Sequence, residues 1–462
     1  MTRREPAPMG HKSGKQVFYG RVVHSKSLTE LEILPRAALG VTETGTIAFL
    51  DSSVASATDA CKKYHPDFDG ATCTTLEPLQ FLFPGLVDTH LHAPQWPNLA
   101  LGMEGDLKEW LHNYTDPIEA SYKNNEKAER VYSAMVRREL ELGTTTCAYN
   151  STIHYQATNT LADICRKQGQ RAIIGKLCIL INSTHGNWED SVEKSLEDEM
   201  KSVDYIRSID PKGEMILPCI QPRGGAYCPP DLMAGLGKQA QNGGELIHVQ
   251  AHMCETTTDI KEALKTHPKY SSYAEMYKAY GMLHEKSIMA HCIHLTETDM
   301  DLLKEQKAGV AHNPNSNTCL RDGECRVREL LDRGIKVGLG TDCSAGYSTF
   351  ILDAMRQASN VSRHLVIHTG EERLKLSFEE IVYLGTMGGA QVVALDDKIG
   401  NFEVGKQFDA LLVDVGIESM SAYVGEHKDD DSALVKKWVF LGDDRSIRKV
   451  YVGGKLVAGK DT

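Results

Sequence analysis

The sequence alternates short apolar runs with longer stretches of helical length. The apolar runs are rich in β-branched residues, as strands are, and intervening stretches such as Lys127–Leu142 repeat apolar residues at helical spacing. The eight strand candidates are Gln80–Val87, Thr144–Tyr149, Arg171–Leu180, Met215–Ile220, Leu246–Ala251, Ser287–Ala290, Gly309–Ala311 and Lys336–Leu339. Strands that alternate with helices form parallel sheets with right-handed crossovers, and eight of them suggest closure. The sequence therefore predicts an α/β protein with a (β/α)8 TIM barrel.

The two ends of the chain carry a different pattern, because short strand candidates there are joined by turns rather than helices. These candidates are Gln16–Val23, Ala38–Val41 and Thr46–Leu50 at one end, and Ala410–Val413 and Lys449–Val457 at the other. A barrel takes about 250 residues, which leaves a substantial remainder in a chain of 462. We expect the terminal sets to pair into a small β-sandwich. The predicted division is 1–80 and 399–462 for this sandwich and 81–398 for the barrel.

The first strand candidate ends in the His-x-His pair of His90 and His92. Side chains alternate along a strand, so both imidazoles would point the same way and could bind one metal ion. Such a pair alone is also typical of two solvated or hydrogen-bonded histidines.

Three later strand candidates also end in possible metal ligands. His252 and His291 follow apolar runs, and Gly334–Leu339 leads into Asp342. Catalytic residues of a parallel barrel gather at the carboxyl ends of its strands. Imidazole and carboxylate ligands suit zinc or another borderline divalent ion, and the set leaves room for a bound water. The sequence thus predicts a metal centre at one edge of the barrel.

At this point the chain resembles the amidohydrolase superfamily and, within it, the guanine deaminase branch. The superfamily pattern is carried by Pro84-Gly85-Leu86-Val87-Asp88-Thr89-His90-Leu91-His92, His252 with Glu255, His291, and Gly340-Thr341-Asp342. The branch pattern adds Gln95, Pro222-Arg223, Ala311-His312, Pro314-Asn315-Ser316-Asn317, Gly400-Asn401-Phe402-Glu403-Val404-Gly405-Lys406 and Leu441-Gly442-Asp443-Asp444-Arg445. The resemblance extends from about Tyr19 to Val457. It implies a barrel flanked by a composite β-domain, and a homodimer.

The resemblance also implies one zinc ion per chain, although iron competes with zinc in such sites. The expected ligands are His90, His92, His252, His291 and Asp342. The expected catalytic residues are Glu255, His291 and Asp342. Glu255 follows His252 by three residues, so it can face the same cavity and move protons without binding the metal. His291 either completes the coordination shell or hydrogen-bonds the attacking water, and the sequence does not choose between these roles.

By resemblance the substrate is guanine, which would be hydrolysed to xanthine and ammonia. The residues expected to contact it are His92, Gln95, Arg223, Gly224, His252 and Asp342. Two positions depart from the family: Gly224 stands where phenylalanine is usual and Asn313 where cysteine is usual. A glycine removes a ring beside the base, so a pterin, 8-oxoguanine or a triazine is the alternative substrate.

Charge and composition limit the partners. The 63 acidic and 51 basic residues give a net charge of −12, which argues against a nucleic-acid partner. No apolar run reaches the roughly 18 residues of a membrane span, and the first residues lack the apolar segment of a signal peptide. We expect a cytoplasmic protein that acts on a small molecule. Its 12 cysteines include no Cys-x-x-Cys pair and are expected to be reduced.

A protein of another class, an idle barrel kept as a scaffold, is the second hypothesis. Idle relatives usually lose a ligand or the proton shuttle, whereas this chain has the complete set. Release of ammonia from candidate bases would separate the two hypotheses.

Overall fold

The computed structural model describes residues 14–241, 244–417 and 423–459. Within these ranges, eight parallel strands lie side by side as a barrel in the order β14-β13-β12-β11-β10-β8-β7-β6, with β9 beside β10. Their bounds are β6 (Leu86–His92), β7 (Thr144–Asn150), β8 (Arg171–Gly175), β9 (Leu177–Cys178), β10 (Ile216–Pro222), β11 (His248–Met253), β12 (Ser287–His291), β13 (Gly309–His312) and β14 (Lys336–Leu339). The predicted TIM barrel is confirmed.

The barrel closes between β14 and β6 through single contacts rather than a continuous ladder. The Thr89 hydroxyl donates to the Leu339 carbonyl at 2.9 Å. One step further along, the Asp342 N–H donates to the His90 carbonyl at 2.8 Å. This closure holds the ends of two strands together, and both carry predicted metal ligands.

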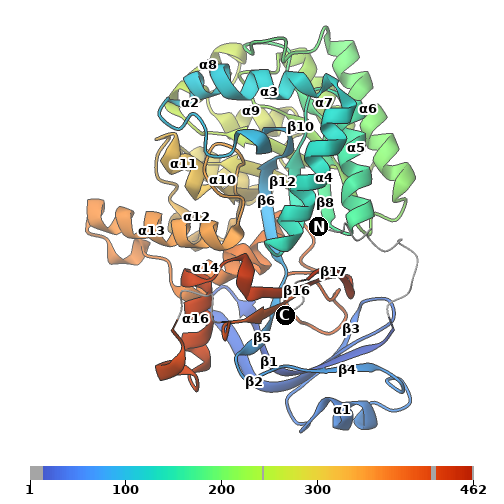
Figure 1. Ribbon diagram of the computed structural model, residues 1–462. Coiled ribbons are helices and arrows are strands. Elements are labelled where there is room, and N and C mark those ends of the chain that lie inside the picture. Colours follow the sequence, from blue (N-terminus) through green and yellow to red (C-terminus); the bar gives the residue numbers. More distant parts are fainter. Residues whose placement is uncertain (1–13, 242–243, 418–422, 460–462) are drawn as a thin grey trace.

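Helices surround the barrel, and the short helices α2 and α3, in the segment between β6 and β7, lie above the ends of the strands (Figure 1). The helices are α1 (Ala57–Lys63), α2 (Leu107–Trp110), α3 (Asp116–Ala120), α4 (Asn125–Glu141), α5 (Tyr155–Gln168), α6 (Val192–Ile209), α7 (Pro230–Ala240), α8 (Thr257–Thr266), α9 (Tyr273–Ala279), α10 (Glu297–Glu305), α11 (Pro314–Cys319), α12 (Val327–Asp332), α13 (Ile351–Thr369), α14 (Phe378–Gly385), α15 (Met387–Val392) and α16 (Asp431–Leu441). The π-helical turn Leu111–Thr115 joins α2 to α3. None of the described helices combines the length and apolar character needed to cross a membrane.

The strands of both termini form one continuous sheet below the barrel (Figure 1). Its members are β1 (Gln16–Ser27), β2 (Glu30–Val41), β3 (Ile47–Asp51), β4 (Thr72–Thr75), β5 (Gln80–Pro84), β15 (Ala410–Asp414), β16 (Ile447–Val452) and β17 (Lys455–Gly459). The expected pairing of the two termini occurs where β15 runs antiparallel to β5. The sheet curls over a shared core in which the Phe18 ring stacks on Phe408 and meets Tyr451 edge-on. It is therefore the small terminal β-domain that the sequence predicted.

Two predicted strands are each divided in the structure. Gln80–Val87 crosses from the terminal sheet into the barrel at Gly85, where a Cβ would lie 2.1 Å from the Thr145 hydroxyl oxygen. Arg171–Leu180 separates into β8 and β9 at Lys176, whose buried ammonium lies 2.7 Å from Glu189 Oε1. Periodicity shows neither break, since both depend on contacts with distant residues.

Candidate active site

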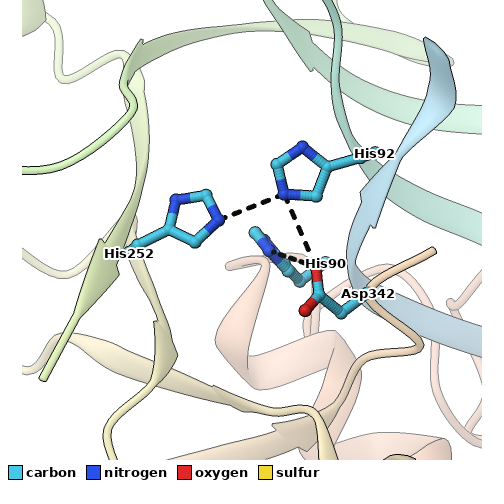
Figure 2. Close-up of side chains that lie close together, drawn as sticks. All are labelled: His90, His92, His252 and Asp342. Carbon is cyan, nitrogen blue, oxygen red and sulfur yellow. Dashed lines mark hydrogen bonds and ion pairs between the residues drawn. The ribbon is translucent and has the colours of Figure 1, made fainter. Parts of the chain in front are cut away.

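Four of the predicted ligands converge at the carboxyl ends of the barrel strands (Figure 2). His90 and His92 end β6, His252 lies in β11, and Asp342 follows β14. The His92 Nε2 atom lies 3.1 Å from His252 Nε2. Asp342 Oδ1 lies 3.2 Å from His90 Nε2 and 3.5 Å from His92 Nε2. These spacings are close to the roughly 3.3 Å expected between neighbouring ligands of a tetrahedral ion with bonds of about 2.0–2.1 Å.

His291 belongs to a second group that shares Asp342 with the first. Its Nε2 atom lies 3.6 Å from Asp342 Oδ2 and 3.6 Å from Glu255 Oε1. The imidazole is thus beside both the carboxylate ligand and the expected proton carrier. Both roles that the sequence left open for His291 are compatible with this position.

Hydrogen bonds behind the imidazoles set their orientation. His90 Nδ1 lies 2.6 Å from Gln250 Oε1, and His252 Nδ1 lies 2.6 Å from the Arg223 carbonyl oxygen. His291 Nδ1 is similarly 2.9 Å from Asn317 Oδ1. Because these partners are oxygen acceptors, each Nδ1 carries the proton and each Nε2 directs a lone pair to the centre.

The electrostatics of this cluster fit a divalent cation. His90 Nε2 and His291 Nε2 are buried, and the described part of the chain gives neither a hydrogen-bond partner. Burial and neighbouring imidazoles lower the pKa of His92 and of His252 well below the usual range, which keeps both neutral. Although burial acts in the opposite direction, His291 and His90 hold the pKa of Asp342 well below its usual range. Neutral imidazoles around an ionised carboxylate form a donor set for zinc or a similar ion.

Glu255 faces a cavity of about 710 Å³ above this cluster. The side chain is buried, and burial together with the Asp342 and Asp259 carboxylates raises its pKa well above the usual range. A carboxyl group in this state holds a proton near neutral pH and can deliver it.

A buried carboxylate, Glu119 of α3, joins the two predicted base-recognition residues. Gln95 Nε2 donates to Glu119 Oε1 at 2.8 Å, and Arg223 Nη1 donates to Glu119 Oε2 at 2.8 Å. Asn187 Nδ2 also donates to Glu119 Oε2 at 2.8 Å. The side-chain oxygen of Gln95, Oε1, accepts from the Ser344 N–H at 3.0 Å. Glu119 therefore fixes which atoms of Gln95 and Arg223 remain open to the cavity. Sequence reasoning missed it, because a glutamate in a short polar helix gives no sign of burial.

The departures from the family pattern have distinct surroundings. Gly224 is buried outside the cavity lining, and a Cβ there would lie 3.3 Å from the Tyr273 hydroxyl. The cavity is instead lined by Tyr227, whose ring lies 5.5 Å from the Arg223 guanidinium carbon. Asn313 is fully buried and is not among the lining residues. An aromatic ring therefore stands beside the site despite Gly224, and substrate contact by Gly224 stays a prediction.

Comparison with known proteins places these features in a family. Residues 81–457 match the amidohydrolase family. The chain belongs to the amidohydrolase family. Over 444 residues it is 42% identical to a probable guanine deaminase of Schizosaccharomyces pombe, covering 96% of this chain and 83% of that protein. Guanine deaminase of Homo sapiens is 37% identical over 99% of this amidohydrolase and 98% of its own length.

The fold comparison agrees with the sequence comparison. The crystal structure of guanine deaminase from C. acetobutylicum, with guanine bound in its active site, has a TM-score of 0.86 and 29% identity to this amidohydrolase. The match covers 96% of this chain and all of the other (100%). The whole two-part architecture is thus shared, not the barrel alone.

Proposed function

We propose that this amidohydrolase hydrolyses guanine to xanthine and ammonia. The observation that carries the proposal is the convergence of His90, His92, His252 and Asp342 beneath a cavity that also holds Glu255. The choice of guanine is supported by full-length similarity to guanine deaminases. Zinc is the proposed ion, at one per chain. The homodimer and the cytoplasmic location expected from the resemblance stay predictions.

The four converging residues would hold the ion, with His291 beside them. A divalent cation held by these residues would lower the pKa of a water and so would supply a nucleophile near neutral pH. Asp342 Oδ2 and His291 Nε2, 3.6 Å apart, are placed to accept hydrogen bonds from a water at this centre. Water contributes a hydroxyl group to the amino-bearing carbon, the carbon–nitrogen bond breaks, and ammonia leaves.

Glu255 moves the protons in this scheme. Its carboxyl group would protonate the ring nitrogen beside the reacting carbon, which makes that carbon a better electrophile. It would then carry the water's proton to the departing amine. Arg223 and Gln95, held by Glu119, would bind acceptors and donors on the edge of the base.

Product formation tests the proposal. Protein purified without chelator should release equal amounts of xanthine and ammonia from guanine and contain about one divalent ion per chain. Chelator-treated protein should lose this activity, and separate reconstitution with zinc and iron should identify the effective ion. Ammonia from a pterin or triazine but not from guanine would replace the substrate. No ammonia from any of these bases would favour the scaffold hypothesis.

A further inference from the structure

Asp322 is a buried carboxyl group in the active-site cavity that the proposed reaction does not use. It lies after α11, and its backbone is held by an N–H donated to the Asn317 carbonyl at 2.9 Å and a carbonyl that accepts from His294 Nε2 at 2.8 Å. The residue is 8% exposed and lines the cavity. Its Oδ2 atom is buried without a hydrogen-bond partner in the described ranges. Two backbone hydrogen bonds therefore hold the loop in place, and one carboxyl oxygen, Oδ2, has no partner and can accept a hydrogen bond.

In the described part of the chain, no salt bridge pairs this carboxyl group with a cation, although His291 and Arg321 act to lower its pKa. The adjacent Arg321 directs its guanidinium to the carbonyl oxygens of Glu104 at 3.4 Å and Gly105 at 3.0 Å. Burial and the Glu255 carboxylate raise the pKa of Asp322 to about 8. A buried carboxyl group without partners is costly to the folded protein, so a ligand that satisfies it would gain that interaction in full.

The strand order separates Asp322 from Arg223 around the barrel mouth. Arg223 follows β10 and Asp322 follows β13, three strands further round the closed ring, whereas Gln95 follows β6, two strands from β13 on the other side. A flat base lying over the metal ligands would therefore have Arg223 on one side and Asp322 on the other. Arg223 offers only donors, which suit carbonyl or ring-nitrogen acceptors, while the unpartnered Oδ2 of Asp322 is an acceptor, which suits an N–H group.

We propose that Asp322 binds the substrate by accepting a hydrogen bond from an N–H of its five-membered ring. This residue would select purines with a free imidazole N–H over heterocycles without one. The fused pyrazine ring of a pterin has only acceptor nitrogens and so offers no N–H to the open oxygen of Asp322. The inference rests on the proposed function, because it takes guanine as the base.

Methylated guanines test the contact, because guanine carries one imidazole N–H, on N7 or N9, and methylation of either nitrogen removes it. kcat/KM is measured for guanine, 7-methylguanine and 9-methylguanine with metal-loaded wild type, Asp322→Ala and Asp322→Asn. Asp322→Ala should lower kcat/KM for guanine by about 10- to 100-fold, and Asp322→Asn by less, because its amide oxygen still accepts. Wild type should discriminate against both methylguanines, and Asp322→Ala should reduce that discrimination at least tenfold, because guanine then loses the same contact.

Glu262→Gln is the matched control. Glu262 is an exposed carboxylate at the cavity rim that pairs with Lys265 at 3.3 Å, so its replacement by an amide removes a carboxyl group from the cavity lining without removing a buried acceptor. It should leave the guanine-to-methylguanine ratios at their wild-type values. Metal content and melting temperature of each variant show whether the site and fold are intact.

Two results would overturn the inference alone. One is an active wild type that accepts either methylguanine as readily as guanine. The other is a folded, metal-loaded Asp322→Ala protein with unchanged ratios for both. A metal-loaded wild type without activity on guanine would instead overturn the proposed function.

Discussion

The two ends of the barrel use buried polar groups differently, although buried atoms without a hydrogen-bond partner occur near both, such as Thr144 Oγ1 and His284 Nε2 near the amino end. At the amino end, α15 and the residues after it pack into the barrel, and His248 Nε2 donates to the Val393 carbonyl at 3.0 Å. Arg171 and Asp409 form a buried ion pair there, with Nε–Oδ2 and Nη2–Oδ1 distances of 3.3 Å. The pair links the start of β8 to the terminal sheet. At this end, charge is used to join two parts of the fold.

At the carboxyl end, several buried polar atoms in and beside the cluster of possible metal ligands lack a protein hydrogen-bond partner. Among the described residues these include His90 Nε2, His291 Nε2 and Asp322 Oδ2. Such groups destabilise a folded chain unless a ligand satisfies them. The difference between the ends indicates where ligands belong, and it predicts that substitutions at one end change stability while those at the other change activity.

The largest expected effect comes from Glu255→Gln at the carboxyl end. The amide cannot carry a proton between the water and the base, so kcat should fall by about 10²–10⁴-fold. No proposed ligand is lost, so the metal content should equal that of wild type. Steady-state kinetics on guanine and elemental analysis check both parts. Wild-type turnover in metal-loaded Glu255→Gln protein would assign the proton transfer to another group.

At the amino end, Arg171→Met should reduce stability without reducing activity. The substitution leaves the buried Asp409 carboxylate without its guanidinium partner, which typically costs about 3–5 kcal/mol in unfolding free energy. The double variant Arg171→Met with Asp409→Leu should recover much of this loss, because no charge is left unpaired. Urea unfolding gives the stability, and kcat/KM below the melting transition should stay near wild type. A large fall in kcat/KM would show that the two ends are coupled.

Glu119→Gln should lower kcat/KM for guanine by about 10- to 100-fold with the metal retained. An amide has one acceptor oxygen, so it cannot accept from both Gln95 and Arg223 as the carboxylate does. The loss should appear mainly as a higher KM, because the base-recognition residues are released. Asp116→Asn is the control on the same helix, since Asp116 accepts from Ser183 and Thr184 but not from Gln95 or Arg223. Equal losses in both variants would indicate a general effect of the helix.

The fold and the grouping of the metal-site candidates could both be predicted from the sequence, for one physical reason. Strand periodicity is local, and the carboxyl ends of parallel strands must meet, so His90, His252 and Asp342 could be placed without knowing any loop. The resemblance to known enzymes supplied Gln95 and Arg223. Their common partner Glu119 could not be placed in this way.

The residues missed by sequence reasoning all lie in loops or short excursions. Glu119, Tyr227 and Asp322 reach the cavity through turns whose course depends on tertiary contacts, such as the His294 hydrogen bond that holds the Asp322 carbonyl. The prediction that Gly224 leaves the base without a neighbouring ring likewise did not include Tyr227, whose position depends on the fold of the whole loop. Local pattern contains no information on these contacts.

The smallest expected effect is a pH-dependent gain in stability from Asp322→Asn. The pKa of Asp322 is raised to about 8 in the folded protein, mainly by burial and then by Glu255, whereas an unfolded aspartate has a pKa of about 3.9. The folded state thus binds this proton more tightly than the unfolded state.

The stabilisation that protonated Asp322 gives to the folded state is present below about pH 4 and is lost as pH rises through about 8, with a slope of at most about 1.4 kcal/mol per pH unit. Asparagine does not titrate, so the variant should equal wild type near pH 5 or be slightly less stable, and exceed it by up to about 4 kcal/mol at pH 9. Urea unfolding of both metal-loaded proteins across this range measures the difference, in which the shared contributions of His291, Asp342 and Arg321 largely cancel. Parallel stability curves would show that Asp322 is already satisfied in the folded protein, and the contrast between the two ends of the barrel would then rest on the metal ligands alone.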